Sequence, residues 1–439
     1  MIDRQNRQQL FYQKCIKKIP ETMKIAILTI GDELLNGDLA DTNTASIARA
    51  LLSHSLPVCE AATIGDYEGD IIVTLQRLAN AHDAIIVTGG LGPTEDDRTA
   101  KAAARAFDRS LSLNDKALMQ IRARFQAHQR EMHPRNEKQA LLPGRSTIIA
   151  NQNGTAPGFH LQSDQAELYF LPGVPSEMLA MLDDYVLPSL LERFPDPPLQ
   201  CQRVITVFGL SEPDVETRIN LNGLPAGVEL AFNVETAMVH VKLRSKGEHA
   251  QQLVDRAELA VRKTLNEHIV GIDGGTLAAS TAHLLTNAGT TLALAESCTG
   301  GLIAKLLTDQ PGSSSFLERS VVTYANSAKM SCLNVDRKIL DQYGAVSSEC
   351  AEAMAKGVHA AAHTSIGLAV TGIAGPDGGT VGKPVGTVYL AMISPWGERI
   401  ERFNFSGSRD QVRLRTAYTA LDWLRRLAIS RLSGEEQEA

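Results

Sequence analysis

The sequence is short of cysteine motifs, aromatic residues, long apolar runs and basic charge, and each shortage excludes a class of protein. The six cysteines are dispersed and form no CxxC pair, which argues against a zinc knuckle or a disulfide framework and favours a reducing cytoplasm. Aromatic residues make up only 5% of the chain, which favours helices packed on sheets over an aromatic-rich β-sandwich. No apolar run is long enough to span a bilayer, so no membrane partner is expected.

The charge balance argues against direct binding to nucleic acid. The chain has 43 lysines and arginines against 50 aspartates and glutamates, a net charge of −7, and it lacks a basic domain or a basic–aromatic stripe. What is present, 439 residues with 44% hydrophobic and 21% charged residues, is typical of a soluble globular protein of two to four domains. Residues 1–22 are polar and basic without the apolar core of a secretory signal, and we interpret them as an N-terminal extension.

Residues 23–194 are predicted to form an α/β domain with a mostly parallel sheet. Continuous apolar runs of strand length alternate with segments of helical spacing, which is the pattern of a parallel sheet covered on both faces. The strands are expected at 24–30, 57–65, 83–90 and 167–173, and the helices at 44–55, 69–82 and 174–194.

Two further domains are predicted. Prolines at 195, 197 and 198 open a small α+β linker domain over 195–272. Its strands are expected at 203–209, 228–234 and 238–245, and its helices at 212–220 and 249–268. A C-terminal α/β domain follows over 273–432, and an acidic tail over 433–439. Its helices are expected at 276–289, 300–309, 347–363 and 410–430, and its strands at 290–295, 321–326, 365–372, 384–394 and 399–407.

The motif AESCTGG (295–301) is the first candidate for chemistry. Ser297 lies between a buried strand pattern and a glycine-opened helix pattern, which is a suitable place for a nucleophile. Backbone N–H groups of the following turn, from Cys298 through Thr299 and Gly300 to Gly301, can stabilise an oxyanion. Lys329 in TYANSAK is a candidate general base if burial keeps it neutral, and Tyr324 is a candidate for positioning that lysine or relaying its proton.

Simpler interpretations exist for each of these residues. A serine at a strand-to-helix turn is most often only an N-cap. Taken singly, Lys329 is most simply a solvated surface lysine and Tyr324 a half-buried strand residue. Cys298 is a rival nucleophile because a helix N-terminus lowers the pKa of a thiol, although no histidine lies close in sequence to pair with it.

Two later loops fit the same pocket. TGIAGPDGG (371–379) follows a predicted strand and places Thr371 and Gly372 at its carboxyl end, where α/β sheets bind ligands. SGSRDQVR (406–413) places Arg409 at the start of the last helix, where an arginine and free N–H groups can hold a phosphate.

Together these motifs resemble the C-terminal domain of the CinA family, which includes nicotinamide-nucleotide amidohydrolases. The match spans the whole third domain; Ser408 is a departure, because the family more often has aspartate before the arginine. The resemblance implies hydrolysis of nicotinamide mononucleotide to nicotinate mononucleotide and ammonia without a cofactor. It further implies Ser297 as nucleophile, Lys329 as base with Tyr324 as its partner, and Thr371 and Arg409 near the substrate.

The first domain carries loops rich in glycine and carboxylates after its predicted strands. The loops 31–43, 88–99, 151–159 and 171–178 are expected at one edge of the sheet, as a binding crevice requires. Their carboxylates suit a hard divalent cation that holds a diphosphate, although single carboxylates most often cap helices and fill turns. The candidate site residues are Asp32, Glu33, Asp66, Gly89, Gly90, Asp97 and Thr99, with Glu95 and Asp96 as further carboxylates.

These loops resemble the molybdopterin-binding fold, and the arrangement resembles the N-terminal domain of the CinA family. The resemblance implies a metal-dependent ADP-ribose pyrophosphatase activity, with Asp66 and Asp97 as candidate ligands of Mg²⁺, Mn²⁺ or Co²⁺. It also implies a homodimer, and the dispersed cysteines favour a cytoplasmic location. Two alternatives stay open: a module that binds a pterin or nucleotide without turnover, and a competence or recombination accessory protein, against which the net charge argues.

Overall fold

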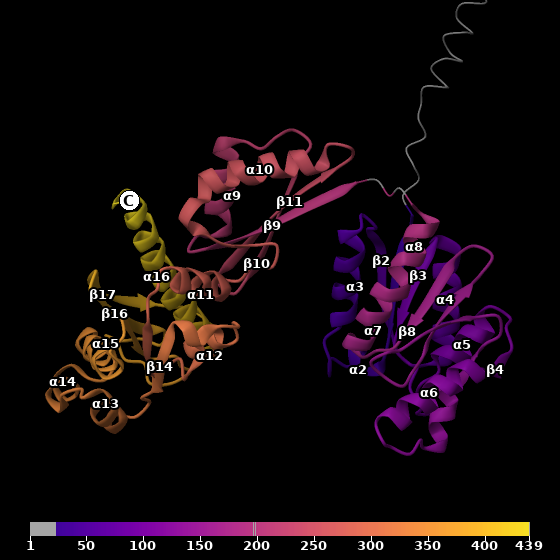
Figure 1. Cartoon of the computed structure of the whole chain (residues 1–439), viewed down its shortest axis with the longest axis horizontal. Helices are drawn as coiled ribbons and strands as arrows, with labels where there is room; N and C mark the ends of the chain where they lie inside the picture. Colours follow the sequence, from indigo (N-terminus) through magenta and orange to yellow (C-terminus); the bar gives the residue numbers. More distant parts are fainter. Residues whose placement is uncertain (1–22, 196, 198, 439) are drawn as a thin grey trace, which may run out of the picture. The chain divides into compact units, whose positions relative to one another are not determined.

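The structure, a computed structural model, describes residues 23–195, 197 and 199–438 (Figure 1). The predicted extension 1–22 and two residues of the predicted proline linker, 196 and 198, lie outside this range. The chain divides into two compact units. Of the described residues, one unit comprises those up to Cys201 together with Lys246–Ala250, and the other comprises Gln202–Ser245 together with those from Gln251 onward. Most of the predicted middle domain 195–272, apart from its residues up to 201 and 246–250, therefore shares a unit with the C-terminal segment.

A six-stranded sheet in the order β2-β1-β3-β8-β7-β6 forms the centre of the first unit. The strands β2, β1, β3 and β8 run parallel, and β7 and β6 are antiparallel additions at one edge. The predicted mostly parallel sheet is therefore confirmed. The strands are β1 (Ile25–Ile30), β2 (Val58–Ile64), β3 (Ala84–Thr88), β6 (Thr147–Ile149), β7 (Gly158–Gln162) and β8 (Glu167–Leu171).

Both faces of this sheet are covered by helices, as Figure 1 shows. In β1, Ile25 and Ile27 pack with α3 (Thr42–Ser53) and α7 (Pro175–Met181). The alternate residues Ala26 and Leu28 pack with α4 (Glu68–Ala81) and α5 (Thr99–Ala106). Because successive strand residues point to opposite faces, a strand buried on both faces is apolar throughout, which is the pattern its sequence has.

Three local features of this unit differ from the predictions or go beyond them. The predicted helix 174–194 is interrupted, because α7 passes into a π-helical turn, η2 (Leu182–Val186), before α8 (Leu187–Arg193). Pro188 lacks the N–H that a regular helix needs there, which explains the break. Further elements are α2 (Asp32–Leu35), α6 (Asp115–Ala127), the 3₁₀-helix η1 (Pro134–Ala140) and the paired strands β4 (Leu111–Leu113) and β5 (Leu141–Pro143).

The second unit begins with a four-stranded sheet in the order β10-β11-β9-β12. Its elements are β9 (Gln200–Phe208), α9 (Glu212–Asn222), β10 (Glu229–Glu235), β11 (Met238–Lys246), α10 (Ala250–Leu265), η3 (Asn266–His268) and β12 (Ile269–Ile272). The edge strand β12 was not predicted, because its glycine-containing sequence reads as a boundary. Within the unit the ring of Phe208 meets that of Tyr418 edge-on at 6.3 Å, and Arg426 pairs with Glu267 at 2.6 Å.

A five-stranded sheet in the order β14-β13-β15-β16-β17 carries the remainder of the second unit. The strands β14, β13 and β15 are parallel, and β16 and β17 continue the sheet antiparallel. The strands are β13 (Leu292–Glu296), β14 (Leu317–Val322), β15 (Ile366–Gly372), β16 (Thr387–Ser394) and β17 (Gly397–Asn404). The helices are α11 (Leu277–Asn287), α12 (Leu302–Thr308), η4 (Ser313–Ser315), α13 (Asn326–Leu333), α14 (Arg337–Tyr343), α15 (Ser348–Ala362) and α16 (Arg409–Glu438).

The two faces of β13 fix where the helices of this sheet lie. Leu292 and Leu294 pack with α11, α12 and α16, whereas Ala293 and Ala295 pack against α15. Gly367 of β15 lies so close to α15 that an added Cβ would fall 2.6 Å from the carbonyl oxygen of Ala355. The predicted strand at 321–326 is wrong for its second half, because β14 ends at Val322 and Asn326 already opens α13.

No helix in the described ranges is both long and apolar enough to cross a membrane.

Candidate active site

Ser297 lies at the carboxyl end of β13, in a turn that leads to α12. Gly300 and Gly301 have φ angles of +61° and +91°, a left-handed conformation that glycine adopts without strain. The buried carboxylate of Glu296 accepts hydrogen bonds from three N–H groups at the start of α12, at 2.9 to 3.2 Å. The interpretation of Ser297 as the N-cap is therefore wrong: Glu296 takes the capping role and leaves the serine hydroxyl free for other contacts.

Lys329 contacts Ser297 directly. Its side chain is only 1% exposed, and its Nζ donates to Ser297 Oγ at 3.1 Å. The same nitrogen donates to the carbonyl oxygens of Thr323 at 2.7 Å and Tyr324 at 3.3 Å. Burial lowers the pKa of Lys329 below its ordinary value of 10.5, because the charged form loses its hydration. The surface-lysine interpretation is therefore wrong.

When the amine of Lys329 is neutral, its three contacts determine where its two N–H groups and its lone pair point. Carbonyl oxygens can only accept hydrogen bonds, so those of Thr323 and Tyr324 take the two N–H groups of a neutral amine. The remaining lone pair then lies toward Ser297 Oγ, which becomes the donor. This is the arrangement in which an amine removes a proton from a hydroxyl.

Cys298 is a poor nucleophile in this environment. Its side chain belongs to the core that α11 and α16 form on the sheet. Burial raises the pKa of the Cys298 thiol to about 12, so the thiol stays protonated at neutral pH and lacks the reactive thiolate. The geometry therefore favours the serine over the neighbouring cysteine.

Tyr324 meets Lys329 through its backbone and not through its hydroxyl. The side chain is 61% exposed, and its hydroxyl accepts a hydrogen bond from Arg409 Nη2 at 2.9 Å. Arg409 Nη1 also donates to the carbonyl oxygen of Gly375 at 2.6 Å. The predicted role of the tyrosine hydroxyl, positioning the lysine or relaying its proton, is therefore corrected: the carbonyl of Tyr324 positions the lysine, and the hydroxyl orients Arg409.

A cavity of about 250 Å³ lies beside the Ser297–Lys329 pair. Thr371 lines it but donates its hydroxyl to the carbonyl oxygen of Ala345 at 2.7 Å, so it fixes the loop before α15. Gly372 also lines it, and an added Cβ there would fall 2.8 Å from the carbonyl oxygen of Thr387. Strand packing therefore already explains this glycine.

Asp377 also lines this cavity, and sequence reasoning missed it. It lies within the motif TGIAGPDGG, but aspartate is so common in turns that the sequence carried no separate signal. Its carboxylate and the guanidinium of Arg409 give the same cavity one charge of each sign.

Two of the four N–H groups predicted to stabilise an oxyanion already donate hydrogen bonds within the protein. The N–H of Gly300 donates to the carbonyl oxygen of Ser297 and that of Gly301 to Glu296. The N–H groups of Cys298 and Thr299 donate to no acceptor among the described residues. These two are the donors that remain for a substrate oxygen.

Arg413 contacts the turn between Ser297 and α12, and this contact was not predicted from the sequence. Its Nε and Nη2 both donate to the carbonyl oxygen of Thr299, at 3.2 and 2.8 Å. Its position four residues after Arg409, on the same face of α16, was the available signal. At the start of that helix Ser408 and Gln411 form a capping box, with hydrogen bonds of 2.9 and 3.4 Å.

The glycines after β3 in the first unit are needed for close packing. An added Cβ at Gly89 would lie 2.1 Å from the carbonyl oxygen of Ile30, and one at Gly90 would lie 2.2 Å from Thr99 Oγ1. Thr99 is fully buried and donates to the carbonyl oxygen of Gly89 at 2.9 Å. The prediction of Thr99 as a ligand-contacting residue is therefore corrected: it fixes the glycine loop from behind.

Asp32 and Asp66 lock two loops of the first unit together. The carboxylate of each accepts the backbone N–H of the other, at 3.0 and 3.1 Å. Burial raises the pKa of Asp66, and Asp32, Glu33 and Asp96 add to this by like-charge repulsion. A cation placed here would relieve that repulsion.

A cavity of about 830 Å³, here called the acidic cavity, opens beside these loops. No lysine or arginine is among the residues that line it. Its carboxylates are Glu33, Asp41, Asp66, Asp96, Asp97 and Glu177. Asp41 and Glu177 were not predicted as site residues, although both lie in loops that were expected at this edge.

A divalent metal fits the acidic cavity only together with a ligand. In the described part of the chain no three His, Cys, Asp or Glu side chains converge into a ready metal site. Asp97, one of the predicted ligands, already accepts hydrogen bonds from the N–H and the hydroxyl of Thr94. Mg²⁺ typically takes one or two carboxylates and completes its shell with waters and substrate phosphates, which these carboxylates allow.

Comparison with known proteins matches a separate family model to each of the two parts of the chain that contain these sites. Residues 26–192 match the family model of a probable molybdopterin binding domain, and residues 275–428 match that of the CinA C-terminal domain. The fold and the site therefore define a protein that joins a molybdopterin-binding-like α/β domain to a CinA-type domain.

Relatives of nearly the same length extend the match over most of the chain. A CinA-like protein of Syntrophotalea carbinolica is 55% identical over 405 residues, which is 92% of this chain and 98% of that protein. A CinA-like protein of Geobacter metallireducens is 48% identical over 93% of this chain and 100% of that protein. The chain belongs to the CinA family.

A solved structure matches one part of the chain. The competence/damage inducible protein CihA from Agrobacterium tumefaciens is 42% identical and covers 34% of this chain and 91% of its own, with a TM-score of 0.33.

Proposed function

We propose that the C-terminal domain hydrolyses the carboxamide of nicotinamide mononucleotide to nicotinate mononucleotide and ammonia. The observation that carries this proposal is the buried contact of 3.1 Å between Lys329 Nζ and Ser297 Oγ. A lysine whose pKa is lowered by burial and whose N–H groups are taken by carbonyls is a general base for the serine beside it.

The proposed reaction runs through an acyl-enzyme. Lys329 takes the hydroxyl proton while Ser297 Oγ bonds to the carboxamide carbon, and the N–H groups of Cys298 and Thr299 hold the oxygen that becomes negative. Lys329 then passes the proton to the amide nitrogen, the C–N bond breaks and ammonia leaves. Water, deprotonated by the same lysine, attacks the ester carbon. The bond from that carbon to Ser297 Oγ breaks, Lys329 returns the proton to Oγ, and the acid that is released ionises in water.

The charges of the cavity support a mononucleotide with a cationic ring. Nicotinamide mononucleotide carries a positive pyridinium ring and a negative phosphate. Asp377 and Arg409 supply one charge of each sign in the cavity that contains Ser297, so both ends of the substrate have a complementary group. Tyr324 and Gly375 hold the guanidinium of Arg409 in place, which reduces the ordering needed on binding.

An ammonia-release assay on nicotinamide mononucleotide tests this proposal. Wild type is expected to release ammonia, and Ser297→Ala and Lys329→Met are expected to abolish the release while keeping the thermal unfolding midpoint of wild type. Lys305→Met is the matched control, since this lysine of the same domain pairs with Asp309 at the surface. A wild-type protein that binds the mononucleotide without turnover would refute the proposal in favour of a binding module.

A second proposed activity is metal-dependent hydrolysis of ADP-ribose by the N-terminal domain. The observation in its favour is a cavity with six carboxylates and no lining lysine or arginine. Asp66, with Asp32 and Glu33 beside it, would hold a divalent cation, which when bound neutralises a diphosphate and activates water. The assay is AMP release from ADP-ribose with and without Mg²⁺ or Mn²⁺; no release with either metal would refute it.

The assembly state and location belong to the same proposal. We expect a homodimer, as the resemblance implies, in the cytoplasm. Light scattering of the full chain after size-exclusion chromatography measures the mass directly, and a mass of one chain would refute the dimer.

A further inference from the structure

A second cavity of about 550 Å³ lies in the N-terminal unit, next to the acidic cavity. We call it the mixed cavity. The two cavities have five lining residues in common: Gly90, Leu91, Gly92, Asp97 and Gln139. The glycine loop after β3 therefore borders both cavities. The two cavities differ in the charged side chains that they offer to a ligand.

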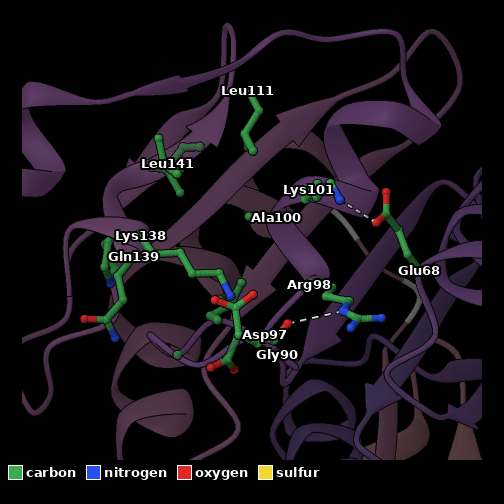
Figure 2. Close-up of a pocket in the computed structure, with 15 residues that line it drawn as sticks. Glu68, Gly90, Asp97, Arg98, Ala100, Lys101, Leu111, Lys138, Gln139 and Leu141 are labelled. Carbon is green, nitrogen blue, oxygen red and sulfur yellow. Dashed lines mark hydrogen bonds and ion pairs between the residues drawn. The ribbon is translucent and has the colours of Figure 1, made fainter. Parts of the chain in front are cut away.

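The mixed cavity has cations that the acidic cavity lacks. Arg98, Lys101 and Lys138 line it together with three carboxylates, Glu68, Glu95 and Asp97. These cations come from the loop before α5, from α5 itself and from η1. Figure 2 shows Lys101 and Lys138 on opposite sides of the cavity, Arg98 below them, and Leu111 and Leu141 above.

Two of these three cations lack a carboxylate partner. Arg98 donates its Nε to the carbonyl oxygen of Glu95 at 3.2 Å, and Lys138 donates to the carbonyl oxygen of Thr94. Neither forms a salt bridge within the described residues, whereas Lys101 pairs with Glu68 at 2.9 Å. Cations whose hydrogen-bond partners are uncharged carbonyls, in a concave site, favour an anion with several oxygens.

Two of the three carboxylates that line the mixed cavity have hydrogen-bond or ion-pair partners. Glu68 pairs with Lys101 and also with Arg105 of the same helix, and these two cations lower its pKa against the effect of burial. Asp97 accepts both the N–H and the hydroxyl of Thr94. The third carboxylate, that of Glu95, is exposed and has no partner among the described residues. An incoming anion therefore meets free donors on Arg98 and Lys138, and Glu95 is the one lining carboxylate without a donor.

One wall of the mixed cavity is apolar. Leu111 of β4 is 37% exposed although it lies on a strand, and Leu141 and Leu142 of β5 stand beside it in the lining. Ala100 of α5 and Leu91 complete the apolar part. A cavity of this volume with apolar walls and a few placed charges is of the size and kind that binds small organic molecules.

We propose that the mixed cavity binds an organic monophosphate with a flat apolar body, of the nucleoside 5′-monophosphate class. The phosphate lies between Arg98 and Lys138, and the base lies against Leu111 and Leu141. AMP is also the product of the ADP-ribose hydrolysis proposed above, but the binding proposed here needs neither metal nor turnover, so its test does not depend on that activity. The acidic cavity, with six carboxylates, repels such an anion when no divalent cation is present.

Calorimetric titration of the full chain in EDTA with AMP, adenosine and inorganic phosphate tests the proposal. All titrations use the Arg409→Gln background, which weakens phosphate binding at the C-terminal cavity. AMP is expected to bind more tightly than adenosine and than phosphate alone. Arg98→Gln and Lys138→Gln are each expected to weaken AMP binding by at least about tenfold and to leave adenosine binding unchanged.

Lys116→Gln is the matched control, because this exposed lysine of α6 lies in the same domain and does not line the cavity. It is expected to leave the AMP affinity at that of the Arg409→Gln background. Equal loss of AMP affinity in Lys116→Gln and Lys138→Gln would overturn the site, as would no measurable AMP binding. Inorganic phosphate binding as tightly as AMP would overturn the role of the leucine wall. Thermal unfolding midpoints equal to that of the background show that the variants are folded.

Discussion

The C-terminal cavity and the acidic cavity, for which we propose two different hydrolyses, bring together different chemical groups. The C-terminal cavity contains a serine and a lysine already in contact, and the charge on the lysine is disfavoured by burial. In the acidic cavity burial raises the pKa of Asp66, repulsion from neighbouring carboxylates adds to this, and no lysine or arginine lines the cavity. One cavity holds a hydroxyl in contact with a buried amine, whereas all the ionisable side chains that line the other are carboxylates.

This difference between the cavities indicates how each proposed reaction would stabilise negative charge. Backbone N–H groups can stabilise the single negative charge that develops on an amide oxygen. A diphosphate arrives with its charge already present, and carboxylates alone would repel it, so a cation from outside is required. A chelator should therefore suppress only the reaction proposed for the acidic cavity, and substitution of a charged residue in one cavity should leave the reaction proposed for the other unchanged.

The largest expected effect is at the Ser297–Lys329 pair. Ser297→Ala and Lys329→Met should each lower kcat/KM for nicotinamide mononucleotide by about a thousandfold or more, because nucleophile and base act as a unit. Ammonia release measures this, and ADP-ribose cleavage in the same variants should be unchanged. Cys298→Ala should keep ammonia release within about tenfold of wild type, since its thiol is protonated. Activity lost in Cys298→Ala but kept in Ser297→Ala would reverse the assignment.

Next in size is the response of the acidic cavity to loss of metal. Chelation with EDTA, or Asp66→Asn, should lower AMP release from ADP-ribose by about a hundredfold, because the cation carries the charge neutralisation. Ammonia release should not change under either treatment, which makes it the internal control. If EDTA suppresses both reactions equally, the contrast between the two cavities is wrong.

Much of this fold could be predicted because its buried strands are continuous apolar runs. The strands β1, β3 and β13 read as such runs, and their residues alternate between two covered faces as that pattern requires. The short antiparallel strands β6 and β12 could not be predicted, because their pairing is decided by neighbours that are distant in sequence.

The candidate residues followed from motifs, but their protonation and roles did not. The burial of Lys329 depends on the approach of α13 to the end of β13, and no local pattern encodes it. Glu296 as the cap of α12 was equally invisible, because a glutamate at a strand end reads as polar surface. The mixed cavity joins side chains from Glu68 to Pro157, so only the folded chain brings its cations together.

The next prediction is that kcat/KM for ammonia release changes by about tenfold per pH unit below the pKa of Lys329. Burial lowers the pKa of Lys329 below 10.5, so the amine is neutral above that lowered pKa and protonated below it. Only the neutral amine can take the serine proton, so kcat/KM for ammonia release should rise with pH and level off above the lowered pKa. Lys329→Arg, whose side chain stays protonated, should show little activity and no such limb. A flat wild-type profile would mean that another group activates Ser297.

The smallest expected effect concerns Asp377, the exposed carboxylate at the C-terminal cavity. Asp377→Asn should raise KM for nicotinamide mononucleotide by about fivefold with little change in kcat, because a partly solvated charge pair contributes about 1 kcal/mol. The same variant should bind the reduced mononucleotide as wild type does, since its dihydropyridine ring is neutral. Competitive inhibition of ammonia release measures that affinity. A matching loss for both nucleotides would show that Asp377 contacts the ribose hydroxyls, which the two share, and would remove charge selection of the ring from the proposed function.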